Sequence, residues 1–598
     1  DESIRLFLSG GLIKGIGEVI ASRIVERFHA DTFNVMENHP EKLAEIKGIS
    51  RTAALRINSE FKEVTGVRSS IMALQDLGLT MKQAFAAYEK YGAAAADIID
   101  QNPYRLIDDV YGIGFERADK IACGIEKYSY FRTYYGIRYI LNCAMEQDGH
   151  TCYPKERLII RSAQMLGTDE DNVKEVYNKL VLDGTLCENL YNNYPAVAFS
   201  SAYNAESYSA YRLIELSRAT PKTMPIASVV RDVLENAGLS EMQETAVNTA
   251  LNENLCIITG GPGTGKTTIL NELISILERS GIKTVLAAPT GRAAKRMEKS
   301  TGRTALTIHR LLEYGQNPEE DNFYGCKFQR NKENPIEAEA VIIDESSMID
   351  AFLLKSLLNA VEPGTRLVFT GDCDQLPSVG PGNVLKDMIK SGYISVCRLK
   401  EVFRQKGNIA FNAHLINEGK MPDLFSAGDF IFIPAVSAED TLDKVLKLYG
   451  DEIKNGVKAD ELQVICPLKR GKIGVYEINA QIRDRENPML LSKNEIKYGE
   501  TLFREGDKIM QTRNNYSKEW FIKGRLKQLS KGTGVFNGDM GVINSIDPED
   551  GALELVFDDE RVCEYDKNEL DQIEHAYAVT VHKSQGSEFE TVIIPLFY

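Results

Sequence analysis

The sequence predicts an α/β protein with a helical N-terminal region and a small β-barrel inserted into its second α/β unit. Three features predict this class: helical stretches joined by glycine turns over the first 125 residues, apolar runs alternating with helices from residue 240 onward, and short β segments over 506–570. Continuous apolar runs are typical of strands buried on both faces of a parallel sheet.

The composition is that of a globular protein, and it limits the partners. The chain has 598 residues, 43% of them hydrophobic, which predicts roughly four domains, and no apolar run is long enough for a transmembrane helix. The 70 basic and 86 acidic residues give a net charge of −16, which excludes unselective coating of a polyanion but leaves room for local nucleic-acid sites. The ten scattered cysteines lack a CxxC pair, so we expect reduced thiols, no zinc site, no membrane contact and a cytoplasmic location.

Four glycine turns divide the N-terminal region into helical pairs, at 14–17, 47–50, 77–79 and 111–114. Their similar spacing predicts a loose internal repeat. Such turns fit helix-hairpin-helix units, in which glycine N–H groups approach a phosphate whatever the base sequence. Two other roles remain open for these turns, either as plain helix connectors or as surfaces for protein partners.

The sequence predicts five domain segments. A helix near 133–147 and a later helix followed by a strand-like run fit a small winged-helix-type module, and Pro221 with Pro225 predicts a linker after it. Apolar strands are expected at 255–259, 284–288, 340–344, 366–370, 462–466 and 591–596. The expected boundaries are 1–125, 126–235, 236–395 for the first α/β unit, 396–505 with 571–598 for the second, and 506–570 for the inserted barrel.

The most specific motif is GGPGTGKTT, which fits GxxxxGK[ST] between a predicted strand and a predicted helix. Backbone N–H groups of such a loop wrap a triphosphate, and the helix N-terminus adds its partial positive charge. Lys266 is expected to reach the β- and γ-phosphates of ATP, and the Thr267 hydroxyl to bind Mg²⁺. A plain glycine-rich turn is the alternative. The candidate nucleotide contacts are Gly261, Pro262, Gly263, Thr264, Gly265, Lys266, Thr267 and Thr268.

Partner carboxylates follow in VIIDESSMID, at the end of another apolar run. Asp344 is placed to hold the Mg²⁺ shell, and Glu345 to activate the attacking water as a general base. Asp344 or Ser346 could instead be an ordinary helix N-cap. Beside the phosphate loop, the catalytic interpretation is favoured, and the two motifs together indicate an NTPase.

Four more motifs follow in order: GDCDQLPSVGPG at 371–382, EVFRQ at 401–405, NGDMG at 537–541 and VHKSQGSEF at 581–589. With the two NTPase motifs, this combination resembles the RecD-like helicases of superfamily 1, in the long form with an N-terminal helix-hairpin-helix region. The resemblance spans essentially the whole chain. It implies two RecA-like lobes with ATP between them, and a 5′→3′ single-stranded DNA translocase and helicase. It also implies a monomer acting on duplex junctions, in DNA repair or replication.

The resemblance assigns further nucleotide contacts. Gln243 resembles the glutamine that reads adenine, Gln375 a γ-phosphate sensor, and Glu588 the residue that approaches the ribose. Arg404 resembles an arginine of the second lobe that stabilises transition-state charge when the lobes close. Taken alone, Arg404 could equally be a surface arginine.

The resemblance also assigns contacts with the DNA strand. Thr290, Gly291 and Arg292 lie at the start of a basic segment, 288–303, and this start resembles a strand-binding motif of the first lobe. A solvated basic helix is the alternative for the segment. His309 resembles another contact, but a lone histidine is more often packed or capping. The contacts implied for the second lobe are Thr580, His582 and Lys583.

Two segments remain open to opposed interpretations. For residues 313–335 the resemblance implies a β-hairpin that acts as a pin and splits the duplex, and the alternative is a polar loop. The basic stretch 517–532, with the only tryptophan, is expected in a long loop of the barrel, either on single-stranded DNA or solvated.

The ends of the chain and the rivals to the helicase function are the last expectations from the sequence. The chain lacks an initiator Met and the final arginine motif that the resemblance requires, so we expect a fragment of a longer enzyme. A DNA-binding ATPase switch or scaffold that does not separate strands, and an RNA-directed translocase, are the rivals to the helicase.

Overall fold

The computed structural model describes residues 8, 16, 18–46, 49–65, 68–110, 112–122, 129–191, 193–314, 328–400, 407–426, 428–523, 529–548, 550–557 and 560–596. These residues form two compact units, Asp1–Ser200 and Ser201–Tyr598. Each unit is described by itself below.

The first unit begins with short helices around two apolar cores. The first core buries Ile24, Met36 and Leu43 between the helices α2 (Glu18–Phe28), α3 (Thr32–Asn38) and α4 (Arg51–Thr65). The second core is formed by α5 (Arg68–Asp76), α6 (Met81–Tyr91), α7 (Ala95–Gln101), α8 (Leu106–Asp109) and α9 (Phe115–Ile121). Two of the expected turns have left-handed glycines, Gly78 (φ +94°) and Gly112 (φ +83°), a backbone that glycine adopts without strain. The turns expected at 14–17 and 47–50 include residues outside the described part.

Three helices and a β-hairpin complete the first unit. The helices are α10 (Tyr130–Glu146), α11 (Lys155–Leu166) and α12 (Glu170–Leu182), and the hairpin pairs β2 (Leu186–Tyr191) with β3 (Tyr194–Phe199). The short strand β1 (Tyr153–Pro154) pairs with β3, so the described strands form a three-stranded antiparallel sheet in the order β1-β3-β2. The unit ends at Ser200, before the boundary expected at 235. The reason is that α13 (Ser200–Arg218) packs on the first α/β lobe, where the Arg212 guanidinium donates to the carbonyls of Leu358 (3.3 Å) and Val361 (2.7 Å).

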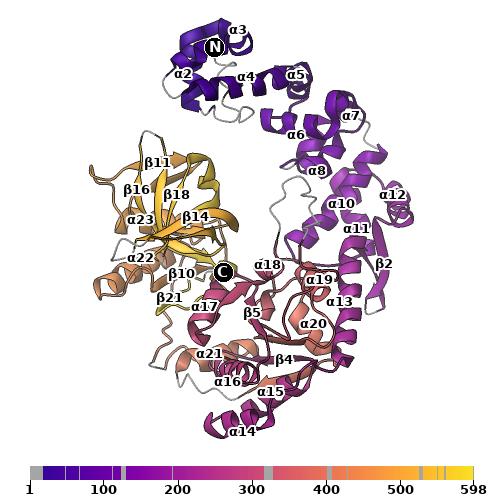
Figure 1. Ribbon diagram of the computed structural model, residues 1–598, viewed down its shortest axis with the longest axis vertical. Helices are drawn as coiled ribbons and strands as arrows, with labels where there is room; N and C mark the ends of the chain where they lie inside the picture. The colour runs from indigo at the N-terminus through magenta and orange to yellow at the C-terminus, as the bar shows by residue number, and fades with distance from the viewer. Residues whose placement is uncertain are drawn as a thin grey trace. The chain divides into compact units, whose positions relative to one another are not determined.

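The second unit contains a parallel sheet covered by helices on both faces (Figure 1). Among the described residues, its six strands run in the order β6-β5-β7-β8-β4-β9. Successive strand residues point to opposite faces, so Ile257 packs with α13, α19 (Ala351–Ala360) and α20 (Val384–Ser391), while Ile258 packs with α14–α17. The strands are β4 (Leu255–Gly260), β5 (Thr284–Ala288), β6 (Ala305–Thr307), β7 (Ala340–Ile343), β8 (Arg366–Gly371) and β9 (Ser395–Leu399). The helices on the second face are α14 (Ala227–Asn236), α15 (Glu241–Asn252), α16 (Lys266–Arg279) and α17 (Gly291–Thr301).

The second lobe has a smaller parallel sheet in its described part, with the order β20-β10-β21. Its strands are β10 (Leu462–Cys466), β20 (Ala578–Thr580) and β21 (Thr591–Ile593), and they pack against α22 (Ala438–Lys454) and α23 (Val475–Glu486). The α/β class is therefore confirmed. Strand β9 begins at Ser395, where the first lobe was expected to end, and pairs with β4 along its whole length.

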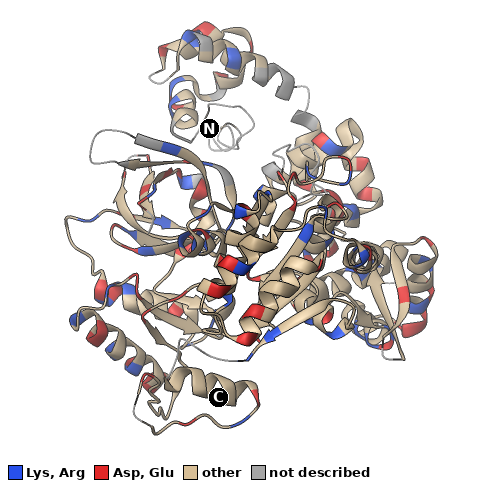
Figure 2. Ribbon diagram, turned by 60° about the horizontal axis from the view of Figure 1, so that its bottom comes forward, with Lys and Arg blue, Asp and Glu red and all other residues tan. Residues whose placement is uncertain are grey.

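An antiparallel β domain interrupts the second lobe. In its described residues, seven strands follow the order β15-β14-β18-β17-β16-β13-β19. The long loop expected at 517–532 is wrong, because β14 and β15 pair across this stretch as a hairpin. Basic and acidic residues are mixed along the elements (Figure 2). The strands are β13 (Lys508–Gln511), β14 (Asn515–Lys523), β15 (Leu529–Val535), β16 (Met540–Ile546), β17 (Leu553–Phe557), β18 (Val562–Tyr565) and β19 (Ile573–His575).

Candidate nucleotide and DNA site

The phosphate loop connects β4 to α16 with the geometry that its glycines permit. Gly263 (φ +76°) and Gly265 (φ +82°) have left-handed backbones, and a Cβ on Gly260 would lie 2.9 Å from the Cβ of Leu399. The Lys266 ammonium donates to the carbonyls of Gly260 (2.5 Å) and Gly261 (3.0 Å). The Lys266 side chain is thus folded back over its own loop. When ATP binds, phosphate oxygens would replace these two carbonyls as acceptors for its ammonium group.

The two carboxylates expected to serve catalysis follow β7. Asp344 accepts a hydrogen bond from the Thr370 hydroxyl (2.5 Å), and Glu345 is buried with a left-handed backbone (φ +49°). A left-handed glutamate is strained, and such strain is concentrated at functional sites. Burial and the adjacent Asp344 raise the pKa of Glu345, while the charges of Arg296 and Lys266 oppose that rise. The Thr267 hydroxyl and the Asp344 carboxylate are hard oxygen donors of the kind that Mg²⁺ prefers.

Asp372 is a residue of this site that the sequence did not single out. It follows β8, is buried, and accepts a hydrogen bond from the Asp374 N–H (3.0 Å). Burial raises its pKa, which the positive charge of Lys266 partly offsets. Its signal in the sequence was the first Asp of GDCDQ, directly after an apolar strand.

The remaining predicted nucleotide contacts are in varied positions. Gln243 is buried and caps its own helix, accepting from the Ser240 N–H (3.0 Å) and donating to the Thr264 carbonyl (3.4 Å), so it lies against the phosphate loop. Gln375 is exposed in the loop after β8. Arg404 lies outside the described residues.

Arg296 of α17 connects the two lobes at this site. Its Nη1 lies 3.2 Å from Oε1 of Glu345, and its Nη2 lies 2.5 Å from Oε1 of Glu588. Glu588, the predicted ribose contact, belongs to the second lobe. The sequence showed Arg296 only as one member of a basic helix, with no sign of these partners.

The start of α17 is covered by the β domain. The Thr290 hydroxyl caps the helix by accepting from the Ala293 N–H (3.2 Å), and a Cβ on Gly291 would lie 2.7 Å from the Cβ of Phe536. The Arg292 guanidinium lies over the ring of Phe589, 5.4 Å from its centroid. In this arrangement Phe536 occupies the space beside the Gly291 backbone that a DNA phosphate is predicted to approach.

Lys295 joins the same helix to a buried carboxylate of the β domain. The Lys295 ammonium lies 3.0 Å from Asp539 Oδ1, and Arg561 lies 2.5 Å from Asp539 Oδ2. The Asp539 side chain is only 3% exposed, and it also accepts from the Phe536 N–H (3.0 Å). NGDMG, predicted only as a family motif, therefore supplies the anchor between the β domain and α17.

His309, in α18 (Ile308–Leu311), lines a cavity of about 190 Å³ between the first lobe and the β domain. Burial lowers its pKa and so favours the neutral ring, and its Nδ1 has no hydrogen-bond partner among the described residues. Its ring contacts Tyr314 and Phe328, whose backbones form a short antiparallel bridge. Of the predicted pin, 313–335, residues 315–327 lie outside the described part of the chain. The other cavity-lining residues are Arg310, Glu313, Thr533, Gly534 and Phe536.

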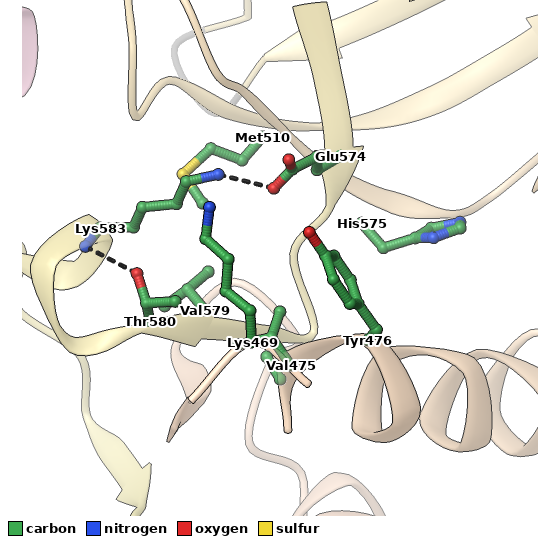
Figure 3. A pocket seen from close by; sticks show the side chains of 10 residues that line it. Lys469, Val475, Tyr476, Met510, Glu574, His575, Val579, Thr580 and Lys583 are labelled. Atoms are coloured by element: carbon green, nitrogen blue, oxygen red, sulfur yellow. Dashed lines mark hydrogen bonds and ion pairs between the residues drawn. The ribbon is translucent and has the colours of Figure 1, made fainter. Parts of the chain in front are cut away.

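The second-lobe contacts meet at a small pocket below the β domain (Figure 3). The Thr580 hydroxyl caps α24 (Val581–Ser584), and the Lys583 ammonium pairs with Glu574 (2.6 Å). Lys469, which the sequence did not single out, points into the same pocket. His582 is exposed. Two cationic groups and a hydroxyl thus face one small space.

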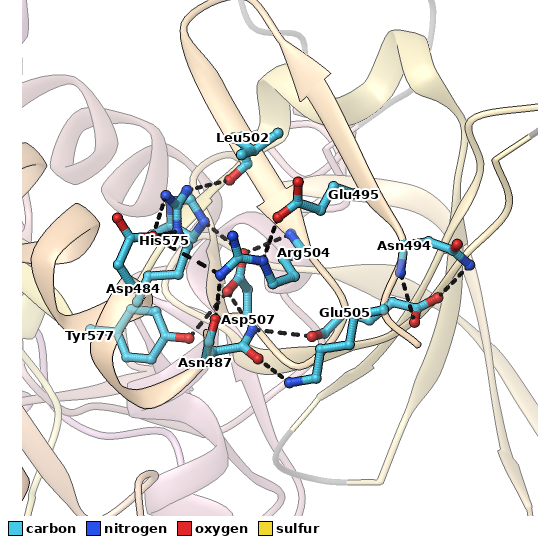
Figure 4. Close-up of polar contacts among 12 residues, drawn as sticks. Asp484, Asn487, Asn494, Glu495, Leu502, Arg504, Glu505, Asp507, His575 and Tyr577 are labelled. Atoms are coloured by element: carbon cyan, nitrogen blue, oxygen red, sulfur yellow. Dashed lines mark hydrogen bonds and ion pairs between the residues drawn. The ribbon is translucent and has the colours of Figure 1, made fainter. Parts of the chain in front are cut away.

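The pocket borders a buried polar network at the base of the β domain (Figure 4). Asp507 accepts from the Asn487 amide (2.8 Å) and the Arg504 N–H (2.7 Å), and it lies 3.0 Å from His575 Nε2. Burial alone would raise the pKa of Asp507, but these bonds outweigh it and lower the pKa. The network fixes the β domain to the second lobe.

The basic hairpin offers fewer free groups than its composition indicated. Trp520 packs on Gly532, where an added Cβ would lie 2.4 Å from the indole ring, and it is partly buried against the core of the β domain. Lys518 pairs with Glu569 (2.5 Å) and lies over the ring of Tyr565. Both side chains are therefore structural here.

Other general expectations can be compared with the described residues. Within them, no helix is long and apolar enough to cross a membrane. The cysteines with described positions are free thiols: Cys143, Cys152, Cys187, Cys256, Cys373, Cys397, Cys466 and Cys563.

Five family models match segments of the chain in order. A helix-hairpin-helix tandem matches 6–63, and the helix-hairpin-helix domain of ATP-dependent RecD2 DNA helicases matches 63–152. An AAA domain matches 243–381, and the SH3 domain of ATP-dependent RecD-like DNA helicases matches 478–557. A UvrD-like helicase C-terminal domain matches 575–597.

Two curated relatives and one solved structure complete the comparison. The RecBCD enzyme subunit RecD of Mycolicibacterium smegmatis is 30% identical over 60% of this chain and 67% of its own. A crystal structure of Bacteroides Pif1 bound to single-stranded DNA is 20% identical over 60% of this chain and 85% of its own, with a TM-score of 0.34, too low to support an argument. The ATP-dependent RecD2 DNA helicase of Deinococcus radiodurans is 30% identical over 97% of this chain and 78% of its own. The chain therefore belongs to the RecD-like DNA helicases in their long form, with an N-terminal helix-hairpin-helix region, and it is an ATP-dependent DNA helicase.

Proposed function

We propose that this helicase is a 5′→3′ single-stranded DNA translocase that acts as a monomer and unwinds duplex junctions. The observation that carries the proposal is helix α17. It begins with the predicted strand contacts Thr290 and Gly291, and five residues later Arg296 reaches the catalytic glutamate. One rigid helix therefore joins the DNA side to the ATP side, as a motor requires and a static DNA-binding protein does not.

At the ATP site, each predicted residue has a distinct task. Lys266 leaves the loop carbonyls for the β- and γ-phosphates, while Thr267 and Asp344 hold Mg²⁺, which neutralises phosphate charge when bound. Glu345 orients the attacking water and accepts its proton. Gln243 and Glu588 hold the adenine and ribose. Gln375 senses the γ-phosphate, and Arg404 stabilises the transition-state charge from the second lobe.

On the DNA side, the proposed contacts divide between the lobes. Thr290, Gly291, Arg292 and His309 belong to the first lobe, and Thr580, His582 and Lys583 to the second. Alternate grip by the two sets would move the strand as the lobes open and close. Each base-pair step opposes about 1.4 kcal/mol of stacking, so repeated separation requires ATP rather than a wedge alone.

The polarity is inferred from the motif set, which resembles that of RecD-like helicases. Forked duplexes carrying either a 5′ or a 3′ single-stranded tail test it, with ATP, Mg²⁺ and Lys266→Ala as the inactive control. Unwinding confined to the 5′-tailed fork is expected. Unwinding from the 3′ tail would reverse the polarity, and DNA-stimulated ATP hydrolysis without strand separation would indicate a switch. A preference for an RNA tail would indicate an RNA-directed translocase.

A further inference from the structure

One guanidinium joins the catalytic glutamate of the first lobe to an acid of the second lobe. Arg296 Nη1 lies 3.2 Å from Glu345 Oε1, and Nη2 lies 2.5 Å from Glu588 Oε1. The two carboxylates differ in exposure: the Glu345 side chain is 11% exposed and that of Glu588 is 67% exposed. The buried Glu345 carboxylate is thus paired with the Arg296 guanidinium, which is also paired with Glu588 of the second lobe.

The geometry depends on arginine. Its planar fork presents several N–H groups in fixed directions, so it can bond two carboxylates at once. A lysine ammonium on the same helix would be a single compact charge. Partly exposed ion pairs contribute little to stability, so folding alone does not account for this arrangement.

We propose that Arg296 is a positioning residue for ATP hydrolysis, which holds the Glu345 carboxylate in its working orientation when the second lobe supplies Glu588. The inference rests on the proposed role of Glu345 as the base. When the lobes separate, Arg296 loses its second anchor and Glu345 loses a fixed partner. Hydrolysis is thereby limited to the closed arrangement.

Arg296 also shares Glu588 with the nucleotide. The ion pair uses Oε1 of Glu588, and Oε2 of the same exposed carboxylate can accept the ribose hydroxyl. Bound ATP and Arg296 then hold one side chain together, so nucleotide binding itself orders Arg296. A role in DNA contact fits less well, because the guanidinium lies between two acids.

The test measures ATP hydrolysis by the full chain with saturating single-stranded DNA. Arg296→Gln is expected to lower kcat by about 10²-fold, the scale on which a 1 Å misplacement of a catalytic group acts, with KM for ATP within about twofold. Arg296→Lys should fall nearly as far, because it keeps the charge but loses the fork. Arg303→Gln is the matched control, since Arg303 lies just beyond the same helix and pairs with Glu278 (2.9 Å) instead. Its kcat should equal that of the wild type, and all variants should keep the same thermal midpoint.

A double-mutant cycle with Glu588→Gln isolates the connection between the lobes. If Arg296 depends on Glu588, the kcat of Arg296→Gln/Glu588→Gln will match that of Arg296→Gln alone. Three results would each overturn the proposal. They are a double-variant loss in kcat equal to the product of the two single losses, an unchanged kcat in Arg296→Gln, and a loss in Arg303→Gln equal to that in Arg296→Gln. A wild type that hydrolyses ATP but does not unwind forked duplexes would contradict only the proposed function. The kcat ratios for ATP hydrolysis would still test Arg296, because they do not require strand separation.

Discussion

Two consecutive basic residues of helix α17, Lys295 and Arg296, each pair with a buried carboxylate, Asp539 and Glu345 respectively. The two carboxylates differ greatly in how many hydrogen bonds and ion pairs they receive. Asp539 is bonded to Lys295, to Arg561 and to the Phe536 N–H, and it fixes the β domain. In the described part of the chain, the Glu345 carboxylate receives one ion pair, from Arg296 at 3.2 Å, on a strained backbone. A fully bonded carboxylate is an anchor, whereas an incompletely bonded one keeps acceptor capacity for water and substrate.

The largest expected effect comes from Glu345→Gln. Loss of a general base costs about 10²- to 10⁴-fold, so kcat for ATP hydrolysis should fall by about 10³. The amide replaces a carboxylate whose burial is unfavourable, so the thermal midpoint should hold or rise. Phosphate release and melting curves measure the two quantities. A large loss of stability would show that Glu345 is an anchor like Asp539.

Asp539→Asn should show the opposite pattern. It leaves the Arg561 charge buried without its partner, which costs about 3 kcal/mol, and the first thermal transition should fall by about 5 °C or more. ATP hydrolysis without DNA should stay within about threefold of wild type, below the general-base range. Asp571→Asn is the control, because its pair with Arg513 is exposed and should contribute almost nothing. Equal melting of the two variants would contradict the anchor role.

Lys295→Met is expected to have the smallest effect of the three variants. The Lys295 side chain is 39% exposed and Asp539 keeps Arg561, so the loss should be about 1 kcal/mol or less. Thermal melting of Lys295→Met and Asp539→Asn, measured together, shows which variant loses more stability. A larger loss for Lys295→Met than for Asp539→Asn would show that Lys295, not Arg561, is the main partner.

Four strands of the first lobe, β4, β5, β7 and β8, could be predicted because each contains the apolar run that a sheet covered on both faces requires. Strand β6 has only three residues, too few to give such a run. The β14–β15 hairpin could not be predicted, because lysines and glycines are scattered through it and give it the composition of a basic loop. Strand β9 was missed because Ser395 and Arg398 interrupt its apolar run.

The site shows the same division. Lys266, Asp344 and Glu345 lie in short motifs whose chemistry can be inferred from neighbouring residues. The bonds of Arg296 to Glu345 and of Lys295 to Asp539 join positions 49 and 244 residues apart, and no local pattern records such a distance. Packing alone brings these partners together. The predicted roles of the motif residues and the expected domain boundaries stay predictions.

On the proposed DNA contact at Gly291, the neighbouring Phe536 makes the β domain a competitor of DNA. Because the ring lies against the glycine backbone, a phosphate that reaches the predicted site must first displace it. The expected affinity for a strand is then reduced by the fraction of molecules in which Phe536 fills the site, so it is weaker than the contacts alone would give. A smaller side chain at position 536 would favour the strand, so the protein exchanges tight binding for ready release.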